Sequence, residues 1–534
     1  MLDLYNKKFY FRSWLVNTFN FMIADFFTWN LWLLLKIPAL LFLILILFLV
    51  YKFGYLTHLQ KKRFQAQGIP VVPFLGMNPV KDMKNLVDKY SDSVYPIKDA
   101  IKKHQDAKAM LIQLGPILAL SLLGPEYIKD FNTKVTTDYD IMEPQKIFDY
   151  LMKNGIIGLN GEDWKLHRKI LSDSFRFDLF EKNIADNYAA TVEYFESLTA
   201  EDMKHYHPRE HLKRVFSAIT GQNFIGENVD KRLIDGKSAL TYLFDLFDEM
   251  SKINQNPIVL MAGPKIVGKG LFGSHRRFLG HCKKFREFLL QIIQEKREHL
   301  EANPKLKGRN IIEGLIEAQK QYPDDPTLND ISIGGEFITL LFAGTDTTSA
   351  LLGMTLYYLA LYPDLVQELR EEINKAIPDG KVTTISQLNS LELMHSTLKE
   401  VLRMHPPVPF SMRRAVHDTN ILDIQIKKGD YVGLGITAND VNPKYWEDPE
   451  KFNPKRFMKG VVPANLEPFA FLTFSVGMRN CIGQHFAMIQ AKLVLSTFLR
   501  MFDFKLKPDY KLQQGFKLLY EPMELVELIL TRRT

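Results

Sequence analysis

Cysteine is scarce in this chain: 534 residues contain only Cys282 and Cys481. A chain of this length can bury a large core without disulfides, so we expect both thiols to be reduced and the folded body to face the cytosol. No cluster of cysteine and histidine has the spacing of zinc ligands, although a lone His485 follows Cys481. The sequence therefore argues against a structural zinc site built from four protein ligands.

A strong charge of one sign is also missing. The 68 Lys and Arg residues exceed the 61 Asp and Glu residues by only a formal net charge of +7. The cations are scattered among the acids, which argues against nucleic acid as a partner. Internal repeats, low-complexity tracts and flavin or nicotinamide motifs are absent from the sequence. With 46% hydrophobic residues, the chain has the composition of a globular protein.

One long apolar run, "LWLLLKIPALLFLILILFLVY" at 31–51, has the length that a helix needs to cross a bilayer. Lys36 and Pro38 lie near its start, where a lysine can reach the headgroups and a proline costs little. The run continues into a basic stretch instead of a cleavage site, so we expect an uncleaved transmembrane anchor. The cations Lys61, Lys62 and Arg63 follow it and predict a body on the cytosolic side.

The segments on either side of this run differ in character. Residues 1–30 are aromatic but interrupted by polar side chains, which favours an interfacial segment over a second span. Residues 52–79 combine basic side chains with spaced prolines and glycines, which predicts a stiff hinge. We expect the folded body to occupy 80–534.

The body has mixed periodicity. In the run "AMLIQLGPILALSLLGPE" from Ala109, the hydrophobic pattern alternates as in a strand and two Gly-Pro pairs interrupt it. This pattern predicts two strands joined by a turn. Helical spacing dominates the rest of the body and predicts helices at 161–175, 183–200, 276–301, 309–321, 331–361, 364–376, 391–405 and 482–501. The expected fold is mainly α with a small β-rich subdomain, an α+β class, in one large unit.

The segment "FSVGMRNCIG" at 474–483 surrounds one of the two cysteines. A lone cysteine is more often a small buried hydrophobe. Here, however, glycines such as Gly483 permit close approach to a flat group, and Phe474 and Arg479 add an aromatic wall and a cation. A helix beginning at Cys481 would favour the thiolate. Since no other protein ligand is near, the partner must bring its own, as haem does with four porphyrin nitrogens.

This segment resembles F-x-x-G-x-R-x-C-x-G, the cysteine-haem signature of the cytochrome P-450 monooxygenases, at all five fixed positions. The resemblance implies the P-450 fold for the body. It implies that Cys481 is the proximal thiolate ligand of a haem b iron and that Phe474 packs beside it. By the same resemblance, Arg479 pairs with a haem propionate and Gly483 lets the chain lie close to the ring.

A second segment, "LLFAGTDTTSALLG", places Asp346 and Thr347 inside a long apolar helix. A carboxylate there is costly without a partner or a task. The plainer interpretation is a core helix whose threonine hydroxyls bond to carbonyls four residues earlier. The segment is similar to the family's A-G-x-D-T-T stretch over the distal haem face. This implies that Ala343 and Gly344 lie against the ring, that Thr347 is the oxygen-side hydroxyl and that Asp346 is the relay acid for protons.

Further positions match the same family. Trp164 and Arg168 share one helical face in "GEDWKLHRKILSDSF", which alone would be a half-buried aromatic with a cation over it. Similarity to the family's W-x-x-x-R implies that both side chains reach haem propionates. Arg413 follows a proline pair and is implied as a second propionate partner, with Arg414 as the alternative.

Three charged residues are expected to brace the fold. Glu400 and Arg403 lie three apart on one helix face, and Arg456 comes later in "FNPKRF". Alone, such a pair is an ordinary exposed ion pair. The family keeps a buried Glu-Arg-Arg network behind the haem loop, so we expect these three to have a structural role.

The resemblance implies a haem-thiolate monooxygenase that inserts one oxygen atom of O₂ into a lipophilic substrate by hydroxylation or epoxidation. Electrons would come from NADPH through a separate flavoprotein reductase, whose acidic face suits the basic region around Lys165, with cytochrome b5 as a further expected partner. The implied location is the endoplasmic reticulum membrane. Two alternatives stay open: an O₂-independent haem-thiolate isomerase or dehydratase of peroxides, and a non-catalytic haem protein.

Substrate access is also expected from the membrane. The apolar stretch "NPIVLMAGPKIVGKGLFG" from Asn256 is too hydrophobic for an ordinary solvated loop and predicts contact with lipid. Candidate walls of the substrate pocket are 135–160, 342–347 and 408–412. None of these segments identifies a particular substrate.

Overall fold

The computed structural model describes residues 50–75, 79–114, 117–141, 143–175, 177–256, 258–259, 263–303, 310–461, 466–516 and 518–533, and eight positions before residue 50. The chain divides into two units, Met1–Ala66 and Gln67–Thr534.

The first unit contains helical segments where the structure describes it. A π-helical segment η1 (Val50–Tyr55) leads into helix α2 (Leu56–Gln65), which carries Lys62 and Arg63 in its last turn. The expected interfacial segment at 1–30 lies outside the described residues except for Thr18, and much of the expected span at 31–51 lies outside them as well. The described apolar residues of that span are helical and exposed, among them Leu40 and Leu47.

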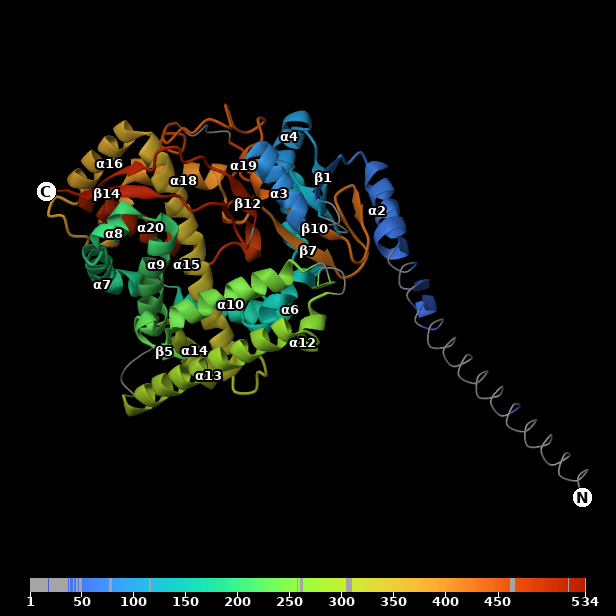
Figure 1. The fold of residues 1–534 in the computed structure, drawn as a ribbon, viewed down its shortest axis with the longest axis horizontal. Coiled ribbons are helices and arrows are strands. Elements are labelled where there is room, and N and C mark those ends of the chain that lie inside the picture. The colour runs from blue at the N-terminus through green and yellow to red at the C-terminus, as the bar shows by residue number, and fades with distance from the viewer. Residues whose placement is uncertain are drawn as a thin grey trace, which may run out of the picture. The chain divides into compact units, whose positions relative to one another are not determined.

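The second unit is built mainly from helices, and its helices and strands together confirm the mixed α and β content expected from the sequence (Figure 1). Its longer helices, of eight or more residues, are α3 (Pro79–Tyr90), α4 (Tyr95–Lys103), α5 (Pro125–Lys134), the 3₁₀ segment η2 (Glu143–Tyr150), α6 (Gly161–Ser174), α7 (Phe177–Glu196), α9 (Pro208–Ile225), α10 (Ala239–Asn254), α13 (Gly273–Ala302), α14 (Ile311–Gln321), α15 (Asp330–Leu361), α16 (Pro363–Ala376), α18 (Glu392–Met404) and α20 (Gln484–Met501). Its shorter helical segments are α8 (Ala200–Lys204), η3 (Val229–Lys231), α12 (Lys265–Gly268), α17 (Ile385–Asn389), α19 (Ile436–Asp440) and η4 (Gly477–Arg479).

The strands gather mainly beside α3 and α4, at one side of the unit (Figure 1). One sheet has the order β1-β2-β3-β10-β7-β4, and the remaining strands of the described residues form four two-stranded pairs. As the sequence predicts, β2 and β3 are antiparallel neighbours. The strands are β1 (Val71–Leu75), β2 (Ala109–Leu114), β3 (Ile117–Leu122), β4 (Tyr139–Ile141), β5 (Leu233–Ile234), β6 (Lys237–Ser238), β7 (Ser411–Ala415), β8 (Thr419–Ile421), β9 (Ile424–Ile426), β10 (Tyr431–Leu434), β11 (Phe502–Leu506), β12 (Gln514–Phe516), β13 (Tyr520–Pro522) and β14 (Leu528–Arg532).

The expected hinge at 52–79 differs from what the structure contains. Residues 56–65 are helical in α2, and Val71–Leu75 form strand β1, which pairs in parallel with β2. Pro73 lies within β1, and a proline is tolerated there because β1 is the edge strand of the sheet. The compact body consequently begins at Gln67 and not at residue 80.

Helix α15 passes through the helical part of the unit (Figure 1). It starts with a capping box between Asn329 and Ser332, which satisfies backbone N–H groups at the helix start. Apolar side chains lie on all sides of it, as expected for a helix enclosed by others. Among the described residues it is the one helix long and apolar enough to cross a membrane, but 83% of its most apolar window is buried in the protein. We therefore assign it to the core.

Candidate active site

The cysteine loop, defined here as residues 474–483, is a tight turn ahead of α20. Gly477 has a φ of 73°, and a Cβ on it would lie 2.8 Å from Asn132 Oδ1, so this position needs glycine. The Cys481 amide donates to the Phe474 carbonyl at 2.8 Å and closes the loop. The sequence predicts a helix beginning at Cys481, but α20 begins at Gln484. The prediction was wrong because hydrogen bonds within the loop hold the backbone of Asn480 and the residues around the cysteine in a non-helical conformation.

Cys481 is exposed, although the loop around it is half-buried. Burial raises the pKa of its thiol, while the Gly483 N–H and Arg168 act in the opposite direction. A thiol that has accessible surface and is also desolvated faces an internal space. Such a thiol is protonated at neutral pH unless a positive charge, such as a metal ion, stabilises its anion. Cys282 is the other free thiol and is buried.

Helix α6 supports the loop through the two residues that the sequence analysis selected. Arg168 donates from Nη1 to the Asn480 carbonyl at 2.8 Å and from Nη2 to Asn480 Oδ1 at 2.7 Å. Buried Trp164 lies under the Arg479 guanidinium, whose Cζ is 3.9 Å from the ring centroid. Arg479 also donates to the Leu159 carbonyl at 3.0 and 3.1 Å. The structure therefore brings Trp164, Arg168 and Arg479 together next to Cys481.

Positive charge accumulates at this place. Burial lowers the pKa of three arginines. The pKa of Arg168 is lowered, the pKa of Arg413 on β7 falls to about 10, and the pKa of Arg479 falls to about 9. Arg413 and Arg168 lower the pKa of Arg479 further, and Asp140 compensates only in part. Within the described residues, the enclosed Nε atoms of Arg413 and Arg479 have no hydrogen-bond partner. Three desolvated guanidinium groups are costly to bury without an anion.

This arrangement fits a ligand with two carboxylates and a central metal ion, such as haem with its propionates. The neighbouring Arg414 stands beside Arg413 on the same strand, where successive side chains point to opposite faces, and it is Arg413 whose charge acts on Arg479. Arg413 is thus the better candidate of the two.

In its central part, helix α15 leaves one small face uncovered. Ala343 is exposed and Gly344 and Thr347 are half-buried, while Phe342, Thr345 and most other residues of the helix are buried. Positions 343, 344 and 347 share one helical face. A core helix with an exposed face of small residues borders an internal space, as expected for a surface against which a flat ligand lies.

The threonine and the aspartate of this helix have different surroundings. The Thr347 hydroxyl donates to the Ala343 carbonyl at 2.6 Å, which is the back-bonding expected of a core threonine. Asp346 is buried and paired with α9, at 3.0 Å from Arg209 Nη2 and 2.8 Å from Lys213 Nζ. Burial raises the pKa of Asp346, but these two cations outweigh it, so its pKa is lowered overall. Asp346 is therefore an ionised carboxylate directed at α9.

The expected charged brace is present. Glu400 accepts two hydrogen bonds from Arg403, at 2.8 and 2.9 Å, and both side chains are fully buried. Arg456 donates to Glu400 Oε1 at 3.1 Å, and the Asn453 amide donates to the same oxygen at 3.0 Å. Because its charges are paired and hydrogen-bonded, the network holds α18 to the chain before the cysteine loop.

A further ionisable side chain near the loop, the carboxyl of Asp440, is protonated at neutral pH. Burial raises the pKa of Asp440 to about 8. Thr473 Oγ1 lies 2.8 Å from Asp440 Oδ2 and 3.1 Å from the Leu402 carbonyl. A hydroxyl has one proton, and a carbonyl only accepts. When Thr473 donates to Leu402, the short contact to Asp440 requires a protonated carboxyl that donates to Thr473.

Sequence reasoning missed a second buried acid on α15. Glu336 Oε1 lies 2.7 Å from His167 Nδ1 on α6, and Glu336 Oε2 accepts from the Ile156 amide at 3.0 Å. Both side chains are fully buried. Glu336 occupies an apolar stretch just as Asp346 does, so the same argument about costly carboxylates would have selected it. Its partners, like Arg209 and Lys213, come from distant parts of the chain.

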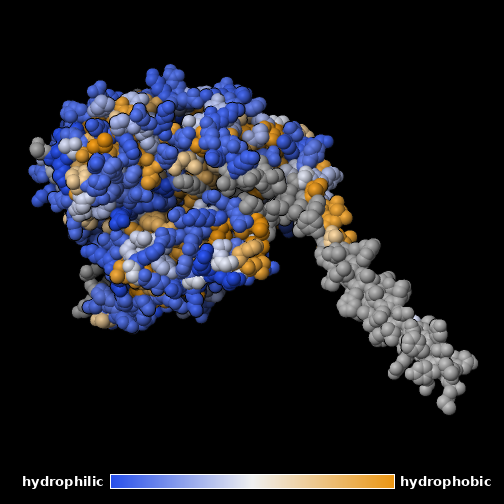
Figure 2. Space-filling model, in the orientation of Figure 1, coloured by the Kyte–Doolittle hydropathy of each residue, from blue (hydrophilic) through white to orange (hydrophobic). Residues whose placement is uncertain are grey.

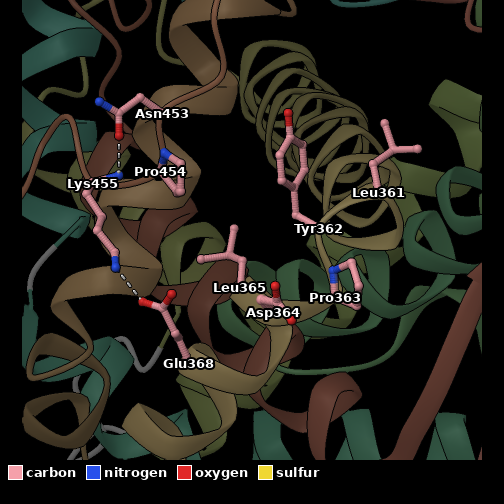
Figure 3. Close-up of a pocket in the computed structure, with 9 residues that line it drawn as sticks. All are labelled: Leu361, Tyr362, Pro363, Asp364, Leu365, Glu368, Asn453, Pro454 and Lys455. Atoms are coloured by element: carbon pink, nitrogen blue, oxygen red, sulfur yellow. Dashed lines mark hydrogen bonds and ion pairs between the residues drawn. The ribbon is translucent and has the colours of Figure 1, made fainter.

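A cavity of about 350 Å³ lies elsewhere, at the junction of α15 and α16 (Figure 3). Tyr362 and Leu365 line one side, and the ion pair between Lys455 and Glu368, 2.6 Å long, closes another. None of the candidate site residues lines it. We therefore do not connect this cavity with the chemistry of Cys481.

Comparison with known proteins agrees with this geometry. The sequence matches the family described as Cytochrome P450 over residues 91–524. It is 28% identical over 449 residues to human "Cytochrome P450 4F8", covering 78% of this chain and 80% of the relative. It is 26% identical over 524 residues to mouse "Cytochrome P450 3A16", and the alignment covers 93% of this chain and 97% of the relative. It is 25% identical over 526 residues to "Cytochrome P450 4c21" of Blattella germanica, and the alignment covers 93% of this chain and 100% of the relative.

Proposed function

Because this chain belongs to the cytochrome P450 family, whose members are oxidoreductase monooxygenases that carry haem and use O₂, we propose that it oxidises a lipophilic substrate. The proposed reaction inserts one oxygen atom of O₂ by hydroxylation or epoxidation. The observation that carries the proposal is the cluster of Arg168, Arg413 and Arg479 beside the thiol of Cys481.

We assign the proximal side of the site to these four residues. When bound, haem supplies the activation of O₂ and the transfer of one oxygen atom. Cys481 provides the thiolate ligand, and the three arginines provide the positive charge that two propionates require. Trp164 and Phe474 supply apolar and aromatic contact, and Gly483 allows close approach of the chain.

We assign the distal side to α15. Ala343 and Gly344 keep the exposed helix face flat enough for substrate and ring. Thr347 holds a proton on its hydroxyl, which can turn from the Ala343 carbonyl toward the exposed face. Asp346 can accept and return a proton only when Arg209 or Lys213 moves away, because both stabilise its ionised form.

We propose that electrons come from NADPH through a separate flavoprotein reductase, with cytochrome b5 as a second donor. Exposed Lys165 and Lys169 lie on α6, the helix that carries Arg168, and supply positive charge for an acidic partner. We also propose a location in the endoplasmic reticulum membrane, with a single-pass anchor at 31–51 and a body that faces the cytosol.

Hydrophobic side chains on the body support a lipophilic substrate from the membrane. Figure 2 shows a mostly hydrophilic surface, with hydrophobic atoms gathered in the region of α12. Ile258, Leu271 and Phe272 in this stretch are exposed by 46%, 59% and 41%. Val259 and Val267 of the same stretch are buried, and residues 257 and 260–262 lie outside the described residues.

The test uses the purified full-length protein and its two cysteines. We expect the reduced protein with carbon monoxide to give the red-shifted absorption of a thiolate-bound haem, and we expect Cys481→Ser to lose it. Cys282→Ser is the matched control, because its thiol is buried away from the loop, and it should keep the absorption. Loss in the Cys282 variant alone, or a folded pigmented protein without the thiolate absorption, would contradict the proposal.

A further inference from the structure

A second cavity, of about 530 Å³, lies between η2, the following loop, α12 and α13. We call it the η2–α13 chamber and define it by Lys146, Asp149, Tyr150, Lys153, Lys265 and Arg286, which are among the residues that line it. Its volume is within the range of small-molecule sites, about 300–1,000 Å³. The candidate active site does not use any of these side chains.

The chamber has an excess of positive charge. Four cations, Lys146, Lys153, Lys265 and Arg286, line it together with a single acid, Asp149. Burial raises the pKa of this carboxyl, and Lys146 opposes the shift. Lys153 and Lys265 are exposed and Arg286 is half-buried, so the cations surround an opening that a ligand can reach. Cations that converge on a cavity favour an anionic ligand.

Hydrogen bonds around Tyr150 hold the walls of the chamber in place. Arg286 Nη2 donates to the Tyr150 carbonyl at 3.0 Å, which ties η2 to α13. The Gly268 amide donates to the Tyr150 hydroxyl at 3.0 Å, and that hydroxyl donates to the Pro264 carbonyl at 3.2 Å. These bonds link three elements, so the chamber is part of the folded protein and not a gap between loose segments.

The lining of the chamber also has an apolar part. Leu279 and buried Cys282 of α13 and buried Leu159 provide an apolar part of the wall. The Leu159 carbonyl accepts both hydrogen bonds of the Arg479 guanidinium in the cysteine loop. The apolar wall of the chamber therefore belongs to the same backbone segment that contacts the cysteine loop, which brings a ligand in the chamber next to the candidate active site.

We propose that the η2–α13 chamber binds the oxyanion head group of an amphipathic substrate whose apolar chain extends toward the site of oxidation. This inference rests on the proposed function, which it deepens by naming the substrate class. The head group is a carboxylate or a phosphate ester, and the cations at the opening neutralise it. Their attraction falls with ionic strength, because exposed charges are screened within about 8 Å at physiological salt.

The test measures binding by calorimetry to the full-length haem protein in a nonionic detergent. Decanoate and decyl phosphate are compared with decanol, which has the same chain length and no charge. We expect both anions to bind more tightly than decanol, and we expect added salt to remove most of the difference. Equal binding of decanol and the two anions would overturn the proposal.

Variants locate the site. The double substitution Lys153→Gln and Lys265→Gln should weaken decanoate binding about tenfold, since each exposed charge contributes modestly, and should leave decanol binding unchanged. Arg277→Gln is the matched control, because Arg277 is an exposed cation on α13 that does not line the chamber. An equal loss in the control, or no loss in the double variant, would overturn the location.

Two further measurements separate the possible failures. Inorganic phosphate alone should compete only weakly. Competition as strong as that of decyl phosphate would mean a site for free anions and would overturn the amphipathic substrate. The carbon monoxide spectrum is recorded on the same samples. A normal thiolate spectrum without preference for anions rejects this inference alone, whereas a missing spectrum with retained preference rejects the proposed function alone.

Discussion

At the scale of single residues, the protonated carboxyl of Asp440 links pH to stability. Its pKa of about 8 in the folded protein exceeds the usual value of about 3.9, so the folded chain holds a proton that the unfolded chain releases. The stabilisation is fully present below pH about 4 and is lost as the pH rises through about 8. The Leu472 amide and the Thr473 hydroxyl, which adjoin the cysteine loop, depend on this carboxyl for hydrogen bonds.

We predict that Asp440→Asn keeps most of the stability, because an amide can both donate to Thr473 and accept from Leu472. Asp440→Ala leaves these groups without partners and should cost about 1–3 kcal/mol. Thermal unfolding midpoints between pH 5 and pH 9 measure both effects, and the asparagine variant should lose less stability than the parent as the pH rises. Equal damage by Asn and Ala would contradict a proton on Asp440.

Thr347 allows a second test at the same scale. We predict that Thr347→Ala keeps the thiolate spectrum but releases several times more of the consumed oxygen as hydrogen peroxide, because a positioned proton donor is removed. Thr355→Ala is the matched control, since Thr355 makes the same back-bond on the same helix, at 2.8 Å to the Leu351 carbonyl, and is buried. Oxygen and peroxide electrodes with NADPH and reductase give the measurement. Unchanged coupling in the Thr347 variant would remove its assigned role.

At the scale of elements, α15 and the loop before α6 are in close backbone contact. A Cβ on Gly335 would lie 2.1 Å from the Lys153 carbonyl oxygen, and one on Gly155 would lie 2.8 Å from the Gly335 carbonyl oxygen. Glu336 accepts from the Ile156 amide in the same place. The helix therefore fixes the path of the loop that leads to Leu159 and the η2–α13 chamber.

Two adjacent glycines of α15 should respond to alanine in opposite ways. We predict that Gly335→Ala costs about 1–3 kcal/mol, because backbone must move to make room. Gly334→Ala should stabilise by up to about 1 kcal/mol, because its Cβ would make ordinary contacts with the side chains of Leu289, at 3.6 Å, and Ile293, at 3.9 Å, and alanine favours helix. Chemical unfolding of the two variants measures the difference. A destabilised Gly334 variant and a neutral Gly335 variant would contradict the contact.

Helices with a clear local pattern were easier to predict from the sequence than features that depend on contacts with distant parts of the chain. The expected helix at 331–361 agrees closely with α15, because an apolar run with an asparagine cap has a clear start. Strand β1 was missed because its proline and the neighbouring prolines and glycines are typical of a linker, and only pairing with β2 makes it a strand. The helix expected at Cys481 was wrong by three residues, because loop hydrogen bonds delay its start to Gln484.

In the candidate site, too, local patterns identified residues but not their distant partners. Local patterns identified Cys481, Trp164 and Arg168, and the structure brings them together around Asn480. The partners of Asp346 on α9 could not be predicted, because more than a hundred residues separate them and no local spacing connects them. Desolvation of Arg168, Arg413 and Arg479 is likewise a property of the folded chain.

At the scale of the whole molecule, the division after Ala66 predicts that the body can be separated from the first unit. A chain of residues 67–534 should fold, bind haem and keep the thiolate spectrum. It should leave the membrane more readily on alkaline extraction, although Leu271 and Phe272 remain exposed and retain some affinity for lipid. Fractionation followed by the carbon monoxide spectrum tests this. A shortened chain that is unfolded would contradict an independent body.

The three clustered arginines have a consequence for how much of the protein a cell accumulates. Mutual repulsion of desolvated guanidinium groups makes the polypeptide alone less stable than its neutralised form, and any anion-bearing cofactor that binds only the folded chain shifts the balance by mass action. Newly made chains that meet a shortage of porphyrin would spend more time open to proteases. Cofactor supply would thereby act as a checkpoint on abundance, separate from transcription.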